Sequence, residues 1–164
     1  MNDLPAQIAT HLRQVFRGGN WTSVNYRDTL ADVTLEEVLA VPAPLTQNSI
    51  ARLVYHVHYY VRAQIDVLDG RPLTARDKYS FDHPDFATSR AWTDYWTQSV
   101  LADVDRLAGL IEALEPAALQ ADFAGEGKYG IVYRNLQGAV EHAHYHLGQV
   151  VLVKRWVRAR GAGA

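Results

Sequence analysis

The sequence predicts an all-α fold, a four-helix bundle with long connections, and three observations support this prediction. Four segments, residues 4–16, 49–68, 89–114 and 132–158, carry apolar side chains at the three- and four-residue spacing of an amphipathic helix. Strand signals are few. The segments between the helices are long, which argues against the simplest up-down-up-down arrangement. With 164 residues, 48% of them hydrophobic, we expect one domain over residues 1–164.

The first helix is expected from Leu4 to Phe16, because Asp3 can cap its start and two glycines follow its end. A connector over residues 20–45 comes next and contains one short helix candidate. This candidate runs from Thr34 to Ala40, where Thr34 and the residue three positions later, Glu37, form a capping box.

The second long helix is expected from about Ser49 to Leu68. A polar loop with the sequence RPLTARDKYSFDHPDF follows it, and a loop of this length in so small a domain is more often functional than slack. The third helix runs from Ser89 to about Leu114. The glycine-rich stretch 121–131 predicts a tight turn or a short hairpin before the last helix, and the terminal GAGA is expected to fray.

Composition excludes several classes of function. The net charge is -2, and no broad basic stripe accompanies the basic tail at 154–160, which argues against nucleic-acid binding. The chain has no cysteine, so any metal must be held by His, Asp or Glu. No signal peptide and no apolar run of about 18 residues is evident, so we expect a cytoplasmic protein without a membrane partner.

The most informative motif is EHAHYHLGQ, which places His142 and His146 four residues apart on the last predicted helix. Residues at this spacing leave the same helix face with their Cβ atoms about 5–6 Å apart, close enough to bind one ion. His144 points about 200° away and cannot join them. A bare pair of this kind also fits two histidines at the edge of the core that are satisfied by hydrogen bonds.

A third histidine would make the pair a metal site, because catalytic zinc usually has three protein ligands and one open position. The second predicted helix offers His56 and His58, which point about 200° apart, so only one of them can face a common site. They lie on opposite flanks of the apolar arc. Helical periodicity therefore leaves both open.

Two other metal architectures do not fit the residues. A thermolysin-like zinc protease needs a glutamate directly after the first histidine of the pair, where this chain has Ala143. A ferritin-like di-iron bundle needs further glutamates from other helices, and the helix expected over 49–68 contains none.

The stretches NSIARLVYHVHYYV and EHAHYHLGQVVLVKR resemble the DinB-like (DinB/YfiT-like) family, four-helix-bundle proteins described as metal-dependent hydrolases. In that family the ligand histidine lies seven residues after a Ser or Thr that opens the second helix, as His56 follows Ser49. The last helix carries His-x-x-x-His followed by x-Gly-Gln, matched here by His142, His146 and the residues to Gln149. The resemblance extends along the chain and includes the RDKYSFD loop. It implies the metal ligands His56, His142 and His146.

The resemblance also implies a function. The expected cofactor is one divalent metal, zinc first and nickel as the second choice, which would activate a water, a thiol or a carbonyl. The expected reaction is hydrolysis or thiol transfer on a small-molecule substrate, with a low-molecular-weight thiol such as bacillithiol or mycothiol as a partner. A homodimer is expected. The alternative is a non-catalytic, stress-associated binding or assembly protein with a structural or vestigial metal site.

The remaining candidates have supporting roles. His58 and His144 are expected to be structural or to lie at a pocket rim, and His11 and His83 to lie on the surface or in loops. Gln149 is expected to hold a ligand histidine through a hydrogen bond. In the long loop, Tyr79 and Asp82 are expected to form turns and to pack. No acid or base is assigned, and the residues expected beside the pocket are Tyr59, Asp82, His83, Lys128, Tyr129 and Asn135.

Overall fold

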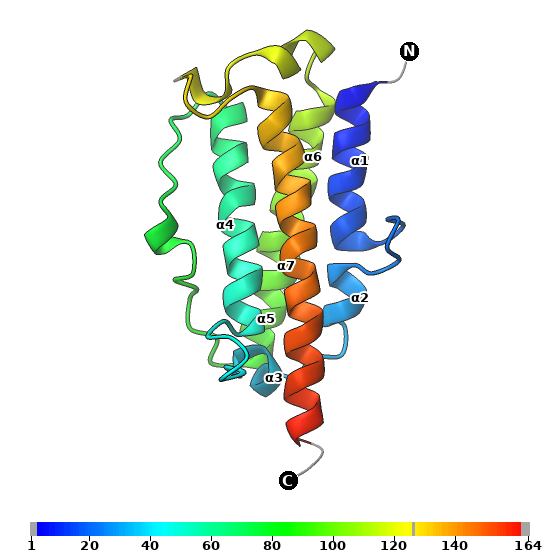
Figure 1. Cartoon of the computed structure of the whole chain (residues 1–164), viewed down its shortest axis with the longest axis vertical. Helices are drawn as coiled ribbons and strands as arrows, with labels where there is room; N and C mark the ends of the chain where they lie inside the picture. The colour runs from blue at the N-terminus through cyan, green and yellow to red at the C-terminus, as the bar shows by residue number, and fades with distance from the viewer. Residues whose placement is uncertain (1–2, 126, 162–164) are drawn as a thin grey trace.

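The computed structural model describes residues 3–125 and 127–161, and these residues form helices and loops without a β-strand. The long helices α1 (Leu4–Arg17), α4 (Ile50–Leu68), α6 (Leu101–Glu112) and α7 (Val132–Gly161) lie side by side (Figure 1). α1 and α4 each pack against both α6 and α7. The predicted all-α class is confirmed. No helix in the described ranges combines the length and the apolar content that crossing a membrane requires.

α1 and the connector after it follow the predicted capping signals closely. The Asp3 carboxylate accepts a hydrogen bond from the Ala6 N–H, and α1 ends at Gly18, whose φ of 106° suits glycine. The connector contains the predicted short helix as α3 (Leu35–Leu39), with the complete capping box of Thr34.

The connector also contains a helix that the sequence did not predict, α2 (Tyr26–Leu30). The Tyr26 side chain is fully buried, and its hydroxyl donates a 3.0 Å hydrogen bond to the backbone carbonyl of Ala143 in α7. Five residues are too short to show a helical period, so tertiary contacts rather than local pattern account for this helix.

α4 begins as predicted, with Ser49 as its N-cap. After α4 the chain runs back along the outside of this helix as a long loop, which contains the short helix η1 (Asp77–Tyr79) (Figure 1). We call residues 71–86 the strap. Tyr79 and Asp82 form turns as expected, because the Tyr79 N–H donates to the Arg76 carbonyl and the Asp82 N–H to the Tyr79 carbonyl, but the half-exposed Tyr79 side chain does not pack into the core.

The third long segment is helical over the predicted range but contains a wide turn. α5 (Ser89–Asp94) passes through the π-helical turn η2 (Tyr95–Val100) into α6. Wide turns of this kind occur mainly as single insertions within α-helices, frequently at functional sites. The spacing of apolar residues does not reveal such an insertion, so the sequence predicted one unbroken helix.

Two short helices, η3 (Pro116–Gln120) and η4 (Phe123–Gly125), connect α6 to α7. The predicted turn or hairpin at 121–131 is present as one isolated antiparallel bridge between Asp122 and Ile131. Glu126 lies outside the described residues. Of the end expected to fray, Gly161 closes α7 and residues 162–164 lie outside the described range.

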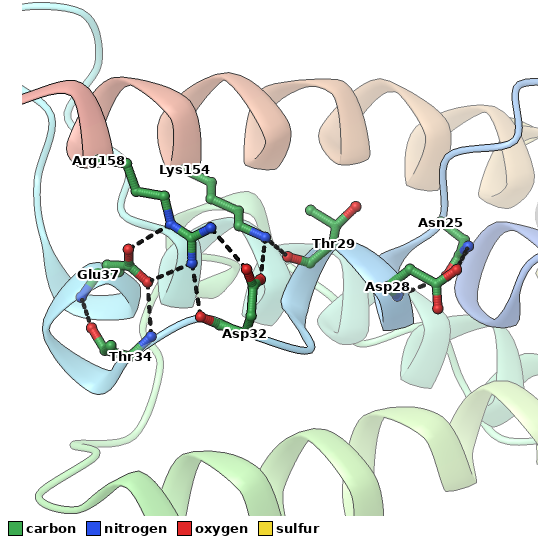
Figure 2. A network of polar contacts seen from close by, with 8 residues as sticks. All are labelled: Asn25, Asp28, Thr29, Asp32, Thr34, Glu37, Lys154 and Arg158. Carbon is green, nitrogen blue, oxygen red and sulfur yellow. Dashed lines mark hydrogen bonds and ion pairs between the residues drawn. The ribbon is translucent and has the colours of Figure 1, made fainter.

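Ion pairs fasten the C-terminal end of α7 to the connector (Figure 2). Arg158 binds the carboxylates of Asp32 and Glu37, and Lys154 binds Asp32 together with the backbone carbonyl of Thr29. We call these side chains the α7 clamp. All four long helices, α7 included, meet in one cluster of buried apolar side chains, which fixes α4 and α7 as neighbours.

Candidate metal centre

His56 of α4 and His142 and His146 of α7 come together between the two helices. One ring nitrogen of each lies within 4.8 Å of the others, and the Nε2 atoms of His56 and His142 are 3.0 Å apart. The residues that the resemblance selected are therefore the ones that the fold brings together. His142 and His146 share one face of α7, and the antiparallel packing of α4 against α7 places His56 opposite them (Figure 1).

The strap holds His56 in a defined tautomer. The Ser80 hydroxyl donates to the backbone carbonyl of Asp77 at 2.7 Å, so its only proton is used. In the 3.0 Å hydrogen bond between His56 Nδ1 and the Ser80 hydroxyl oxygen, His56 must therefore be the donor. This assignment leaves the Nε2 of His56 with a free lone pair facing His142 and His146.

His146 is held in the same way from within its own helix. The Gln149 amide nitrogen donates to the Tyr145 hydroxyl at 3.0 Å, which turns the amide oxygen toward His146. His146 Nδ1 lies 2.6 Å from this oxygen and donates to it. The expected supporting role of Gln149 is confirmed, and the Nε2 of His146 also carries a lone pair.

The lone pair on His56 Nε2 needs a hydrogen-bond donor or a cation as its partner. A proton on His142 Nε2 would satisfy His56 alone, whereas one cation bound by all three nitrogens would satisfy His56 and His146 together. Zinc–nitrogen bonds of about 2.0–2.1 Å bring their nitrogens to roughly 3.4 Å from one another, so small ring rotations suffice.

Aromatic rings surround the three histidines and remove water from them. Phe81 of the strap stacks on His56 with ring centroids 4.0 Å apart, and Tyr60 contacts the edges of both His56 and His142. Burial lowers the pKa of His56 and of His142 to about 4, helped by repulsion from His146. Burial also lowers the pKa of His146. All three rings are thus neutral at pH 7, the state in which imidazole binds a metal.

His58 lies on the other side of α4 and is a structural residue, as expected. Its Nε2 donates to the Asp103 carboxylate and its Nδ1 accepts from the Tyr95 hydroxyl, both at 2.8 Å. Only 5% of the side chain is exposed. Both ring nitrogens are used within the protein, and His58 lines a separate cavity of about 690 Å³ between α4, the strap and the η2 turn.

The other histidines lie away from the centre. His83 donates from Nδ1 to the Pro84 carbonyl within the strap and stacks on Phe86, and His11 is exposed on α1, so both match their expected loop and surface positions. His144 is partly buried on α7 and is not part of the three-histidine group.

A groove of about 1050 Å³ begins at His56 and His142 and continues between α4, the strap and α7. We call it the axial groove. Among the residues expected beside the pocket, Asn135 lines this groove, whereas Tyr59 lines the cavity on the His58 side. The other expected residues do not line the axial groove, and these are Asp82, His83, Lys128 and Tyr129.

Sequence reasoning missed the residues that support His56. Ser80, Phe81 and Tyr60 surround this histidine, and the Tyr60 hydroxyl donates to the Asp77 carboxylate. The available signal was the RDKYSFD stretch, which the resemblance included without assigning its residues a role. In an irregular loop no helical or strand periodicity indicates which way the side chains of a serine and the aromatic residue after it point.

The chemistry that this arrangement permits is binding of one divalent cation by three neutral imidazoles beside an open groove. No family model, curated protein or solved structure shows a significant match to the chain.

Proposed function

We propose that the protein binds one divalent metal ion through His56, His142 and His146. The observation that carries this proposal is the convergence of three ring nitrogens, two of them with lone pairs fixed by Ser80 and Gln149. Zinc is the first choice for three neutral nitrogen ligands and nickel the second.

The proposal includes membership of the DinB-like family and its four-helix bundle. The four long helical segments and the His-x-x-x-His pair followed by Leu147, Gly148 and Gln149 support it. The same resemblance leads us to propose a homodimer. Sedimentation at micromolar concentration should then report twice the 18.4 kDa mass of one chain, and a species of 18.4 kDa would contradict it.

For the reaction, we propose metal-assisted hydrolysis or thiol transfer on a small molecule bound in the axial groove. Bound to the three histidines, the cation would supply a Lewis acid that acidifies a water or thiol, or that polarises a carbonyl. Two of these histidines line the groove, so a substrate there reaches the centre directly.

The groove also offers a carboxylate for proton transfer. Of its two acidic residues, Asp77 is engaged by the Tyr60 hydroxyl, whereas Glu141 has no hydrogen bond or ion pair with the described residues. Glu141 directly precedes His142 in α7. We therefore assign the proton transfer to Glu141, which would accept a proton from the attacking group and return it to the leaving group.

The test combines metal loading with turnover. Protein purified without a histidine tag is loaded with zinc or nickel and given a panel of activated esters, amides and thiol acceptors. The proposal predicts turnover that disappears in His142→Ala and falls by about 10²–10⁴-fold in Glu141→Gln, with zinc content in Glu141→Gln unchanged. Metal binding that raises the melting temperature without consumption of any substrate would instead favour the non-catalytic alternative.

A further inference from the structure

The axial groove has two ends with different chemistry. Helices α4 and α7 run antiparallel (Figure 1). Since His56 and His142 face each other, Gln64, eight residues after His56, is expected at the level of Arg134, eight residues before His142. At 1.5 Å per residue, these two side chains lie about 12 Å along the helices from the histidines. All four residues line the same groove.

Gly138 lies between the two ends, four residues before His142, and lines the groove. Glycine is unfavourable in the interior of a helix compared with alanine. A Cβ added to Gly138 would meet no atom within 4 Å, so helix packing does not require the glycine. A side chain at this position would instead narrow the axial groove.

The charges of the groove are separated along its length. The carboxylates Asp77 and Glu141 lie toward the histidine end, while Arg134 at the far end is exposed and forms no ion pair with the described residues. An anionic group of a ligand is therefore favoured at the end of the groove that is distant from the metal centre.

Gln64 at this end has an unsatisfied amide. Its Oε1 is buried and has no hydrogen-bond partner among the described residues. A buried acceptor without a donor is destabilising. Gln64 lines the groove, so a ligand N–H group that reaches this oxygen would supply the missing donor.

We infer that the axial groove binds an elongated amide that ends in a carboxylate, with its reacting group at the three histidines. Arg134 binds the carboxylate, Gln64 pairs with the amide, and Gly138 leaves the width through which the chain of the ligand passes. This inference rests on the proposed metal centre, since the centre fixes which end of the ligand reacts.

The probe that tests it is mercaptoacetyl-diglycine, a thiol joined through two amides to a carboxylate, with an extended span of roughly 10 Å. Its binding to the zinc-loaded protein is measured by calorimetry. Mercaptoacetate, which carries the thiol and a carboxylate without the amide chain, serves as the short probe for the metal alone.

The decisive variant is Gly138→Leu, and the matched control is Gly109→Leu in α6, where an added Cβ also meets nothing within 4 Å. Gly138→Leu should weaken the affinity for the long probe by about tenfold or more and change the affinity for mercaptoacetate by no more than about twofold. Gly109→Leu should change neither affinity. Gly138→Ala serves as a milder second variant. Unchanged binding of the long probe to folded Gly138→Leu would overturn the inference.

Two comparisons address the far end. Arg134→Gln should abolish the preference for the carboxylate probe over its C-terminal carboxamide, whereas Arg155→Gln, an exposed control on α7, should keep it. Gln64→Leu should abolish the preference for the amide over an ester analogue. Absence of both preferences in the wild type would also overturn the inference.

The failures of the two proposals are distinguishable. If the wild type binds neither zinc nor mercaptoacetate, the metal centre itself is wrong. If zinc and mercaptoacetate bind and the longer probe gains nothing, the centre stands and the assignment of the groove is wrong.

Discussion

His56 and His58 lie two residues apart on α4 and face two different environments. His58 uses both ring nitrogens in hydrogen bonds to Tyr95 and Asp103, and the residue is only 4% exposed. His56 uses only Nδ1 for a hydrogen bond to Ser80 and directs Nε2 at two further histidines beside an open groove. His146, another candidate ligand, is only 6% exposed and so almost as buried as His58, which means that burial alone does not separate a structural histidine from a candidate ligand. What separates the two kinds of histidine is the number of ring nitrogens that already have a hydrogen-bond partner within the protein.

The largest expected effect on stability is on the His58 side. His58→Ala leaves Asp103 and Tyr95 without their partner and opens a cavity, so the free energy of unfolding should fall by about 2–4 kcal/mol. Urea denaturation of the metal-free protein measures this loss. His56→Ala in the same metal-free protein should lose clearly less, and an equal loss in both variants would remove the distinction between the two histidines.

The next effect concerns metal affinity on the His56 side. Ser80→Ala removes the group that orients His56 and should weaken zinc binding by about 10–100-fold, as is typical for partners of ligand histidines. Competition with a chromogenic chelator gives the affinity. Ser99→Ala, on the cavity at the His58 side, is the control and should bind zinc as the wild type does. Equal affinity in all three proteins would show that Ser80 does not support a ligand.

A smaller effect is expected from the ionisation of His58. Burial lowers the pKa of this histidine below its ordinary value of 6.5, although Asp103 opposes the shift. The unfolded chain therefore binds more protons than the folded protein as the pH falls below 6.5, so His58 contributes stability at neutral pH that is lost on acidification.

Denaturation at pH 7.5 and pH 5.5 in the presence of a chelator tests whether His58 makes the protein less stable as the pH falls. The wild type should lose more stability between these two pH values than His58→Gln does. His11→Gln, an exposed residue of α1, should behave as the wild type. A steeper loss in His58→Gln than in the wild type would reverse the predicted direction.

The smallest effect is expected at the α7 clamp (Figure 2), whose Arg158 lies twelve residues, about 18 Å along α7, beyond His146. Arg158 holds the pKa of Asp32 and of Glu37 below their usual range, so the clamp stabilises the fold at neutral pH and weakens in acid. Asp32 is exposed and the pair of Arg158 with Glu37 is only part-buried, so Arg158→Gln should lower the melting temperature only slightly, and by less in 1 M salt. A change in zinc affinity in this variant would contradict the independence of the two regions.

Sequence reasoning succeeded where a period or a cap determines the structure. Apolar spacing predicts the long helices, Asp3, Thr34 and Ser49 mark helix starts, and the four-residue spacing of His142 and His146 predicts their shared face. These features depend on neighbours within one or two turns. Each of them is present in the structure.

The remaining features depend on residues distant in sequence. Periodicity leaves His56 and His58 equivalent, because what separates them is Asp103 and Tyr95 on one side and Ser80 on the other. The direction of Ser80 and Phe81 follows from where the strap crosses α4. No local pattern determines that crossing, and the same limit explains why α2 and the η2 turn were not predicted.

The most direct test of the central claim is the zinc content of single-histidine variants purified without a tag and dialysed against zinc. We expect about one equivalent per chain in the wild type and in His144→Ala, and a loss of bound zinc in each of His56→Ala, His142→Ala and His146→Ala. His144 is the matched control, since it lies on α7 between two proposed ligands without joining them. No zinc in the wild type, or a full equivalent in all three ligand variants, would contradict the account.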